Sequence, residues 1–212
     1  NKMNENLPVN VTSDLPEKGK VSEITVSGGN NSFVAHADTV KNNITVMLND
    51  PRSGHGGNRS PIPLNTDFYH LFVMGPETYE DTYFLVPKDR ALTEYTNDTL
   101  KEKYGSLAPE TIKKLLQFPA LFAAENRFDG IVNKTKDAYF GLVNDIKIQD
   151  NGTKVYFTIL QTIPQQLLNE RCFEFGIVDN GKSPFELYRT HWALKQIDLI
   201  EALQRVGVRI FW

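Results

Sequence analysis

The sequence predicts an α+β fold: a curled, mostly antiparallel sheet or small β-barrel with flanking helices, preceded by a β-rich extension. The main observation is a pair of β-prone runs over 137–163 separated by Asn151-Gly152, because Asn-Gly tolerates the positive φ angles of a tight hairpin turn. Gly141 in the first run indicates a bulge or bend where the sheet curls. Apolar residues at helical spacing follow Pro109 and Asp198, which adds helices to the strands.

The charge balance and the apolar runs bound the class of protein. The chain has 212 residues, with 26 acidic and 23 basic side chains and a formal net charge of −3. This balance argues against a nucleic-acid partner, which would normally meet a clear basic excess. No apolar run approaches the roughly 18 residues of a membrane helix, and no signal-peptide pattern opens the chain. The single cysteine excludes an internal disulfide framework. We therefore expect a cytoplasmic globular protein without a membrane partner.

The composition divides the chain into four parts. Residues 1–20 are polar and include prolines, which predicts a flexible tail. Residues 21–49 are rich in asparagine and alternate β-prone runs with Asn/Gly turns, which predicts either a simple hairpin or an element of assembly. Residues 50–65 hold the glycines and prolines of a loop. Residues 66–212 form the α+β domain, whose apolar end at Trp212 is typical of a piece of a longer protein.

The α+β domain is expected to open with a central strand over 68–74, because that segment is apolar on both faces. A second strand at 83–86 stops at a proline. A short helix is expected at 100–104, and a clearer one begins at Pro109, which occupies the favoured first turn. A buried strand over 120–123 then leads to the hairpin.

The last third of the domain is predicted to hold two helices and a closing strand. The first helix is expected to begin at Pro164 and to end at Gly176, with a buried stripe that includes Cys172. Asp198, with an acidic residue three positions later, makes a version of the capping box at the start of the second helix. Alternating apolar residues over 208–212 predict the strand.

Arg189, Thr190, His191 and Trp192 are the best candidates for ligand binding. They set a guanidinium, a hydroxyl, an imidazole and an indole side by side, which could recognise a planar or anionic ligand by stacking and bidentate hydrogen bonds. The alternative is a structural corner in which Trp192 is buried and Thr190 and His191 bond to the backbone.

No catalytic or metal-binding pattern is complete in the sequence. The four histidines lack the paired spacing of a zinc site, and His36 with Asp38 is more typical of a turn-stabilising pair than of half a metal site. The glycines around His55 lack the Lys-Ser/Thr ending of a phosphate loop. Cys172 lies on a predicted buried stripe, where it would act as a small hydrophobe rather than as a nucleophile with His191 as its base. We therefore expect no metal, no cofactor and no catalytic residue.

Several sequence segments between residues 27 and 206 together carry a resemblance to a known module. They are SGGNNSFVAHADTVKNN (27–43), FYHLFV (68–73), DRALTEY (89–95), FPALFAAEN (118–126), AYFGLVNDIKIQDNGTKVYF (138–157), IPQQLLNE (163–170) and FELYRTHWALKQIDLIEAL (185–203). Together they resemble an uncharacterised bacterial module found in genes of mobile and anti-phage defence islands. The resemblance implies a bacterial cytoplasmic protein, and it implies no particular activity or site residue.

These observations favour a non-enzymatic binding, sensor or assembly module. The β-rich extension needs a partner to bury a core, so we expect a protein partner or self-association, with a small-molecule ligand as a further option. Two other functions stay open. One is a hydrolase or nucleotide-processing enzyme with Arg189, His191 and His36 in a cleft. The other is a small-barrel nucleic-acid-binding domain, which the missing basic patch disfavours.

Overall fold

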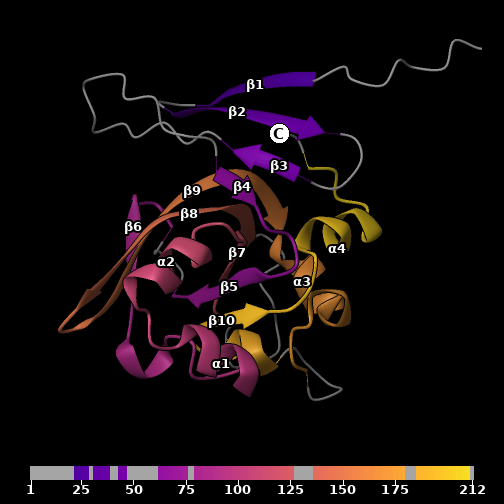
Figure 1. Cartoon of the computed structure of the whole chain (residues 1–212). Coiled ribbons are helices and arrows are strands. Elements are labelled where there is room, and N and C mark those ends of the chain that lie inside the picture. The colour runs from indigo at the N-terminus through magenta and orange to yellow at the C-terminus, as the bar shows by residue number, and fades with distance from the viewer. Residues whose placement is uncertain are drawn as a thin grey trace, which may run out of the picture.

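The strands of the protein form two sheets (Figure 1). The computed structural model describes residues 22–28, 31–38, 43–46, 62–75, 79–126, 136–179 and 185–210. The first sheet is antiparallel and contains, in spatial order, β1 (Ser22–Gly28), β2 (Asn31–Asp38), β3 (Asn43–Val46) and β4 (Ile62–Leu64). The tail predicted over 1–20 lies outside the described residues.

Strand β4 corrects one expectation. The sequence predicts a loop over 50–65, whereas Ile62–Leu64 pair with β3 and the part of that range before residue 62 lies outside the described residues. Pro63 cannot donate a backbone hydrogen bond, but proline is tolerated in an edge strand. Because β4 is the edge of its sheet, the proline that indicated a loop is compatible with a strand.

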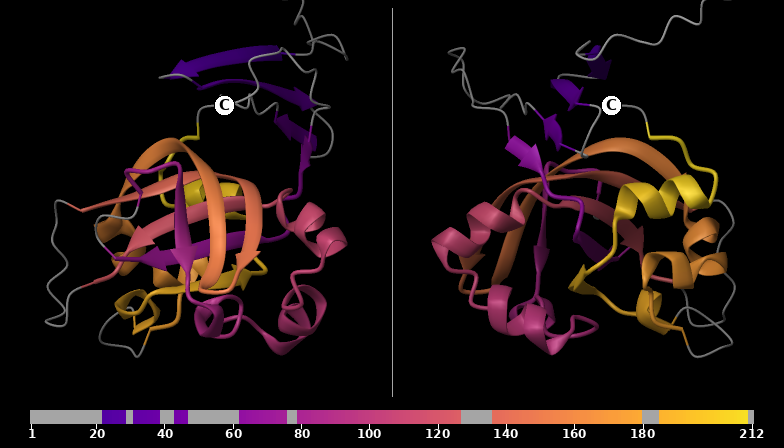
Figure 2. Two further views of the ribbon diagram at one scale, coloured as in Figure 1. Left: turned by 90° about the vertical axis from the view of Figure 1, so that its left-hand side faces the viewer. Right: turned by 45° about the vertical axis from the view of Figure 1, so that its right-hand side comes forward.

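The second sheet is the centre of the α+β domain. Its six strands run in the order β10-β5-β7-β8-β9-β6. The β5–β7 pair is parallel, and the other pairs are antiparallel. The sheet curls into a half-barrel whose edges are β10 and β6, which confirms the predicted α+β class (Figure 2). The bounds are β5 (Tyr69–Met74), β6 (Tyr83–Val86), β7 (Pro119–Ala124), β8 (Asp137–Gln149), β9 (Gly152–Pro164) and β10 (His191–Lys195).

The predicted hairpin is confirmed, and so is the bulge within it. β8 and β9 meet at the turn formed by Asp150 and Asn151, and their register shifts at Phe140/Gly141 and again further along the hairpin. A Cβ atom on Gly141 would lie 2.1 Å from the carbonyl oxygen of Thr158, so only glycine allows the strands to approach this closely. The shift in register moves side chains from one face to the other and allows the sheet to curl.

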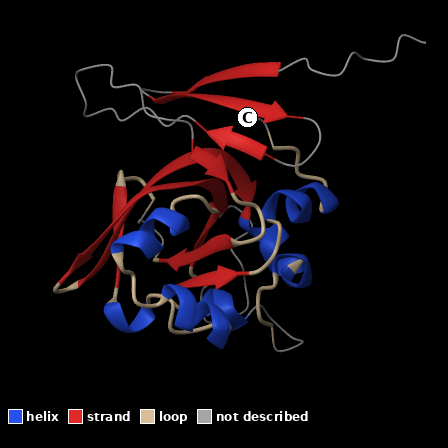
Figure 3. Ribbon diagram, in the orientation of Figure 1, coloured by secondary structure: helices blue, strands red, loops and turns tan. Residues whose placement is uncertain are grey.

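Helices cover both faces of the sheet (Figure 3). Helices α1 and α2 pack with the concave, aromatic core, and α3, α4 and the 3₁₀ turns η2 and η3 pack with the core on the other face. All six residues of β5 are buried because both of its faces are covered, as its two-faced apolar pattern predicts. The bounds are η1 (Lys88–Arg90), α1 (Asp98–Tyr104), α2 (Pro109–Leu115), α3 (Gln165–Glu170), η2 (Cys172–Phe175), η3 (Phe185–Tyr188) and α4 (Leu199–Arg205).

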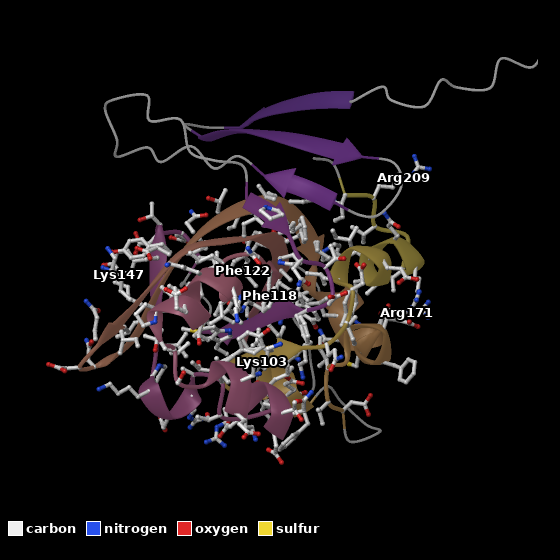
Figure 4. All side chains as sticks on the ribbon, in the orientation of Figure 1. Lys103, Phe118, Phe122, Lys147, Arg171 and Arg209 are labelled. Atoms are coloured by element: carbon white, nitrogen blue, oxygen red, sulfur yellow. The ribbon has the colours of Figure 1, made fainter. Side chains whose placement is uncertain are left out.

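The concave core is built from stacked and edge-on aromatic rings. Phe72 and Phe122 stack with centroids 5.5 Å apart and ring planes 8° apart, and Phe84 meets Phe72 edge-on at 5.0 Å. Phe118 and Phe122 both lie inside the molecule in Figure 4. Offset and edge-on arrangements of this kind contribute about 0.5–1.5 kcal/mol per pair beyond the burial of their area. The aromatic core fixes the curvature of the half-barrel from the inside.

The helix predicted from Pro164 to Gly176 is interrupted. α3 ends at Glu170, Arg171 leaves the helical region with φ −123° and ψ 33°, and the 3₁₀ turn η2 continues to Gly176, which is left-handed with φ +61°. Cys172 is nevertheless buried, as the predicted stripe requires. Leu168 of α3 and Cys172 and Phe175 of η2 all lie in the core on this face, whereas Phe173 is exposed.

The last helix begins where the sequence predicts, but no strand follows it over residues 208–210. The side chain of Asp198 caps α4 by accepting a 2.9 Å hydrogen bond from the backbone N–H of Glu201. Val208 and Ile210 are half-buried against the core on the helix-covered face opposite the concave core. Their alternation therefore reflects one-sided packing rather than strand pairing, and residues 211–212 lie outside the described part of the chain.

Candidate functional site

The four predicted ligand-binding residues lie in edge strand β10 and immediately before it. Arg189 is exposed and Thr190 is half-buried, whereas the side chains of His191 and Trp192 are 0 % exposed. The alternation of the strand directs Trp192 into the concave core and His191 to the opposite face. The sequence predicted no strand here, and the structure places two of the four side chains out of reach of solvent.

Trp192 is held by His70 of the neighbouring strand β5. The indole Nε1–H of Trp192 donates to Nδ1 of His70 over 3.0 Å, and Nε2 of His70 lies 2.9 Å from the backbone oxygen of Leu115. An imidazole that accepts at Nδ1 and donates at Nε2 is neutral. Burial lowers the pKa of His70 to about 4, against the opposing effect of the Leu115 carbonyl. This arrangement is structural, because both ring nitrogens already have partners.

On the opposite face, Glu186 of η3 joins two side chains of β10. Its carboxylate oxygens lie 2.8 Å from Nζ of Lys195 and 3.1 Å from Nε2 of His191, and one of them accepts a 2.8 Å hydrogen bond from the backbone N–H of Val178. The Glu186 side chain is 0 % exposed. Burial lowers the pKa of Lys195, and the carboxylate of Glu186 partly opposes this effect. Lys195 also donates to the backbone oxygen of Tyr95 over 3.1 Å.

The two nitrogens of His191 both face hydrogen-bond acceptors. Nδ1 lies 2.7 Å from the backbone oxygen of Arg189, and Nε2 lies 3.1 Å from the Glu186 carboxylate. A carbonyl and a carboxylate can only accept, so both contacts are satisfied when each nitrogen carries a proton. Both ring nitrogens of His191 therefore have partners within the protein, as those of His70 have one strand away.

Ion pairs surround this cluster at the surface. Arg189 pairs with Glu94 over 3.1 Å, and Glu94 also lies 3.5 Å from Arg90. The hydroxyl of Thr190 donates to the carboxylate of Glu125. The half-exposed guanidinium of Arg189 is thus the most accessible cation of the predicted site, and any anionic ligand would compete with Glu94 for it.

The outer edge of β10 is closed by the segment 91–96. The backbone N–H of Leu92 donates to the oxygen of Trp192 over 2.8 Å, and the N–H of Leu194 donates to the hydroxyl of Thr96 over 3.0 Å. Leu92 and Tyr95 adopt positive φ angles of 60° and 54° to follow this path. A closed edge cannot add a further strand from another chain, so β10 offers no route to assembly by edge pairing.

The Glu186 cluster stabilises the fold rather than offering reactive groups. The Glu186 carboxylate lies within hydrogen-bond distance of the His191 imidazole and the Lys195 ammonium, and the ring of Tyr95 covers His191 with centroids 4.8 Å apart. Burial, followed by the charges of Glu94 and Glu186, raises the pKa of Tyr95, which keeps this phenol neutral. A buried ion pair with satisfied partners is costly to break from one side, which is the expected behaviour of a structural anchor.

The other candidates from the sequence analysis are Cys172, His36, Asp38 and His55. Cys172 is 5 % exposed, its thiol contacts the backbone oxygen of Leu168 at 3.2 Å, and burial raises its pKa to about 11. It lies in the core as a small hydrophobe. The side chains of His36 and Asp38, and all of His55, lie outside the described residues. Within the part of the chain that is described, no group of three or more His, Cys, Asp or Glu side chains is arranged to hold a metal ion.

A second surface, which the sequence analysis did not single out, lies at the free end of the β8–β9 hairpin. We define the Tyr–Lys face as Tyr83 of β6, Lys147 of β8, and Lys154 and Tyr156 of β9. Tyr83 is opposite Tyr156, and Lys147 is opposite Lys154, so the four side chains share one face of the sheet. Their neighbours Phe84, Ile146 and Val155 point to the concave core.

The Tyr–Lys face is held together by cation–π contacts. Nζ of Lys154 lies 3.5 Å from the ring centroid of Tyr83 and 5.2 Å from that of Tyr156, and Nζ of Lys147 lies 5.0 Å from the Tyr156 ring. Lys147 also pairs with Asp145 over 3.5 Å. Tyr83 is 40 % exposed, and Lys154 and Tyr156 are half-buried. The polar alternation of Lys154 and Tyr156 along the hairpin was the one signal in the sequence for an exposed face here.

Comparison of the chain with models of protein families, with curated proteins and with solved structures gave no match. Among the described residues, no helix is both long enough and apolar enough to span a membrane.

Proposed function

We propose that the protein is a non-enzymatic binding module and that the Tyr–Lys face is its contact surface. One observation carries the proposal: the exposed ring of Tyr83 and the half-buried ring of Tyr156 lie together beside two lysines on the sheet. Tyrosine supplies a large and rigid contact area with a polar tip, and for that reason it is enriched at binding surfaces. The Glu186 cluster supports the same conclusion, because its charged groups are already paired with each other.

The resemblance to a module of bacterial mobile and anti-phage defence islands is a second support for this proposal. It supports a bacterial origin and a cytoplasmic location. The experiment below separates by mass three classes of occupant of the Tyr–Lys face: a second copy of the chain, another macromolecule and a small molecule.

The test compares three forms of the full chain. Wild type, the double variant Tyr83→Ala with Tyr156→Ala, and the control Lys103→Gln are each mixed with cell extract, re-isolated and measured by native mass spectrometry. Lys103 is a suitable control because its ammonium also contacts rings, those of Phe68 and Tyr104, at a different place in the molecule (Figure 4). We expect one defined adduct on wild type and on the control that is absent from the double variant. The same adduct on all three forms, or none on wild type, would contradict the proposal.

A further inference from the structure

The two rings of the Tyr–Lys face lie side by side on adjacent strands. Tyr83 and Tyr156 have centroids 5.6 Å apart with ring planes tilted by 50°. They project from paired positions of adjacent strands, so the sheet fixes their separation. Exposed rings on a β-sheet are a recurring platform for unstacked nucleobases, because each base presents a flat π surface whatever its sequence.

Lys154 adds a positive charge between the rings. Its ammonium contacts both rings, and among the described residues no carboxylate lies within ion-pair distance of it. The described cations elsewhere on the surface include several that carry an acid partner, such as Lys101 with Asp98 and Lys113 with Glu110. The two rings hold the Lys154 ammonium in place, and it has no counter-ion among the described residues. It can therefore form an ion pair with an anionic group of a ligand.

We propose that the Tyr–Lys face binds single-stranded nucleic acid, with bases stacked on Tyr83 and Tyr156 and a backbone phosphate paired with Lys154. This inference rests on the proposed function, because it names the occupant of that same face. A duplex is a poorer ligand, since its bases are already stacked inside the helix. The net charge of −3 limits the electrostatic contribution, so stacking supplies most of the affinity.

A protein partner fits this surface less well than a nucleic acid does. The centres of protein interfaces are depleted in lysine and enriched in apolar and aromatic groups. Here the centre of the face is the Lys154 ammonium, and the apolar neighbour on the same face, Leu85, is half-buried. A ligand with flat rings and regularly spaced anions matches this combination.

Fluorescence anisotropy with a short labelled single-stranded oligonucleotide tests the proposal on the full chain. At low salt, wild type is expected to bind, and a duplex of the same sequence is expected to bind more weakly. Each tyrosine-to-alanine change should weaken binding by roughly tenfold, the effect typical of one stacked base. Tyr83→Phe should bind almost as wild type does, because the ring remains. Near-ultraviolet circular dichroism establishes that each variant is folded.

The salt dependence gives a second readout. For Lys154 in contact with one phosphate, the slope of log K against log salt should be about −0.7, and Lys154→Gln should bring it close to zero. The control Lys103→Gln removes the same charge elsewhere and should leave the slope unchanged.

The outcomes are distinct. Wild type that fails to bind the single strand at low salt, or alanine variants that bind as tightly as wild type while folded, would overturn the inference. If extract capture then yields a protein or a second copy of the chain on wild type but not on the tyrosine double variant, the binding function stands and only its nucleic-acid occupant is wrong. If no adduct depends on the tyrosines, the proposed function fails as well.

Discussion

The indole N–H of Trp192 donates to Nδ1 of His70 over 3.0 Å and thereby fixes which nitrogen of that imidazole carries the proton. The opposite nitrogen donates to the Leu115 carbonyl, so His70 ties strand β10 and the end of α2 to the centre of the sheet. The same edge strand carries His191, whose two nitrogens both face acceptors. Adjacent strands therefore each hold a buried histidine whose two ring nitrogens both have partners within the protein.

Because His70 is buried in its neutral form, we expect the folded protein to lose stability in mild acid. Its pKa is about 4 in the folded protein, below the usual 6.5, so the unfolded chain binds the proton more readily. The stability that His70 contributes is complete above about pH 6.5 and falls as pH drops toward 4, by on the order of 3 kcal/mol in total. Urea unfolding at pH 7, 6 and 5 measures this loss. The same series on His70→Gln should lack this component of the pH dependence, and equal slopes for both proteins would contradict the assignment.

We expect the buried charges of Glu186 and Lys195 to be strongly coupled in their effects on the free energy of unfolding. Glu186→Gln leaves the Lys195 ammonium buried without its counter-ion and should lower the free energy of unfolding by about 3–5 kcal/mol. Lys195→Met removes the other half of the pair. The double variant should lose less than the sum of the single losses, because the unpaired charge is then absent. Urea unfolding of the three variants measures the coupling, and additive losses would show that the two groups do not depend on each other.

We expect that a side chain at position 141, in the bulge of the hairpin, destabilises the protein. In Gly141→Ala the new methyl group would meet the Thr158 carbonyl oxygen at 2.1 Å and the Phe122 ring at 3.0 Å, so β8 and β9 must separate. We expect a loss of about 2 kcal/mol or more in the free energy of unfolding. Gly207→Ala is the comparison, because its Cβ meets nothing within 4 Å and only the positive φ of 86° opposes it, at about 1 kcal/mol. A smaller loss at 141 than at 207 would be inconsistent with the close approach.

We expect the thiol of Cys172 to be unreactive in the folded protein. With a pKa of about 11 and 5 % exposure, about one thiol in a thousand is ionised at pH 8, and the reagent cannot reach it. Reaction with Ellman's reagent should be slow in the folded protein and rapid in denaturant. Fast reaction in native buffer would restore the nucleophile hypothesis for this residue.

Much of the fold could be predicted because its signals are local. The β8–β9 hairpin, the apolar faces of β5, the proline that opens α2 and the cap at Asp198 each have their signal within a few residues. The turn of the hairpin is formed by Asp150 and Asn151, one residue before the predicted Asn151-Gly152 pair. The bulge at Gly141 was predictable for the same reason. The closing strand was wrong over residues 208–210 because alternation alone does not distinguish strand pairing from one-sided packing.

The candidate site was less predictable. The sequence singled out residues 189–192 because their chemistry is unusual, but their proximity to Glu186, Glu94 and Glu125 depends on the path of the chain. Strand β10 escaped detection because His191 and Lys195 are polar. Their burial becomes tolerable only when Glu186 satisfies both of them, and nothing at positions 191–195 indicates that partner.

The sequence by itself determined the fold class, the hairpin, the caps and the central strand, since periodicity and turn chemistry act over a few residues. The tertiary structure alone decided the strand order, the pairing of His70 with Trp192 across 122 positions, and the meeting of Tyr83 with Tyr156 on one exposed face. These contacts join segments far apart in the chain. Their energies exist only after the sheet has brought the segments together, so no local pattern can encode them.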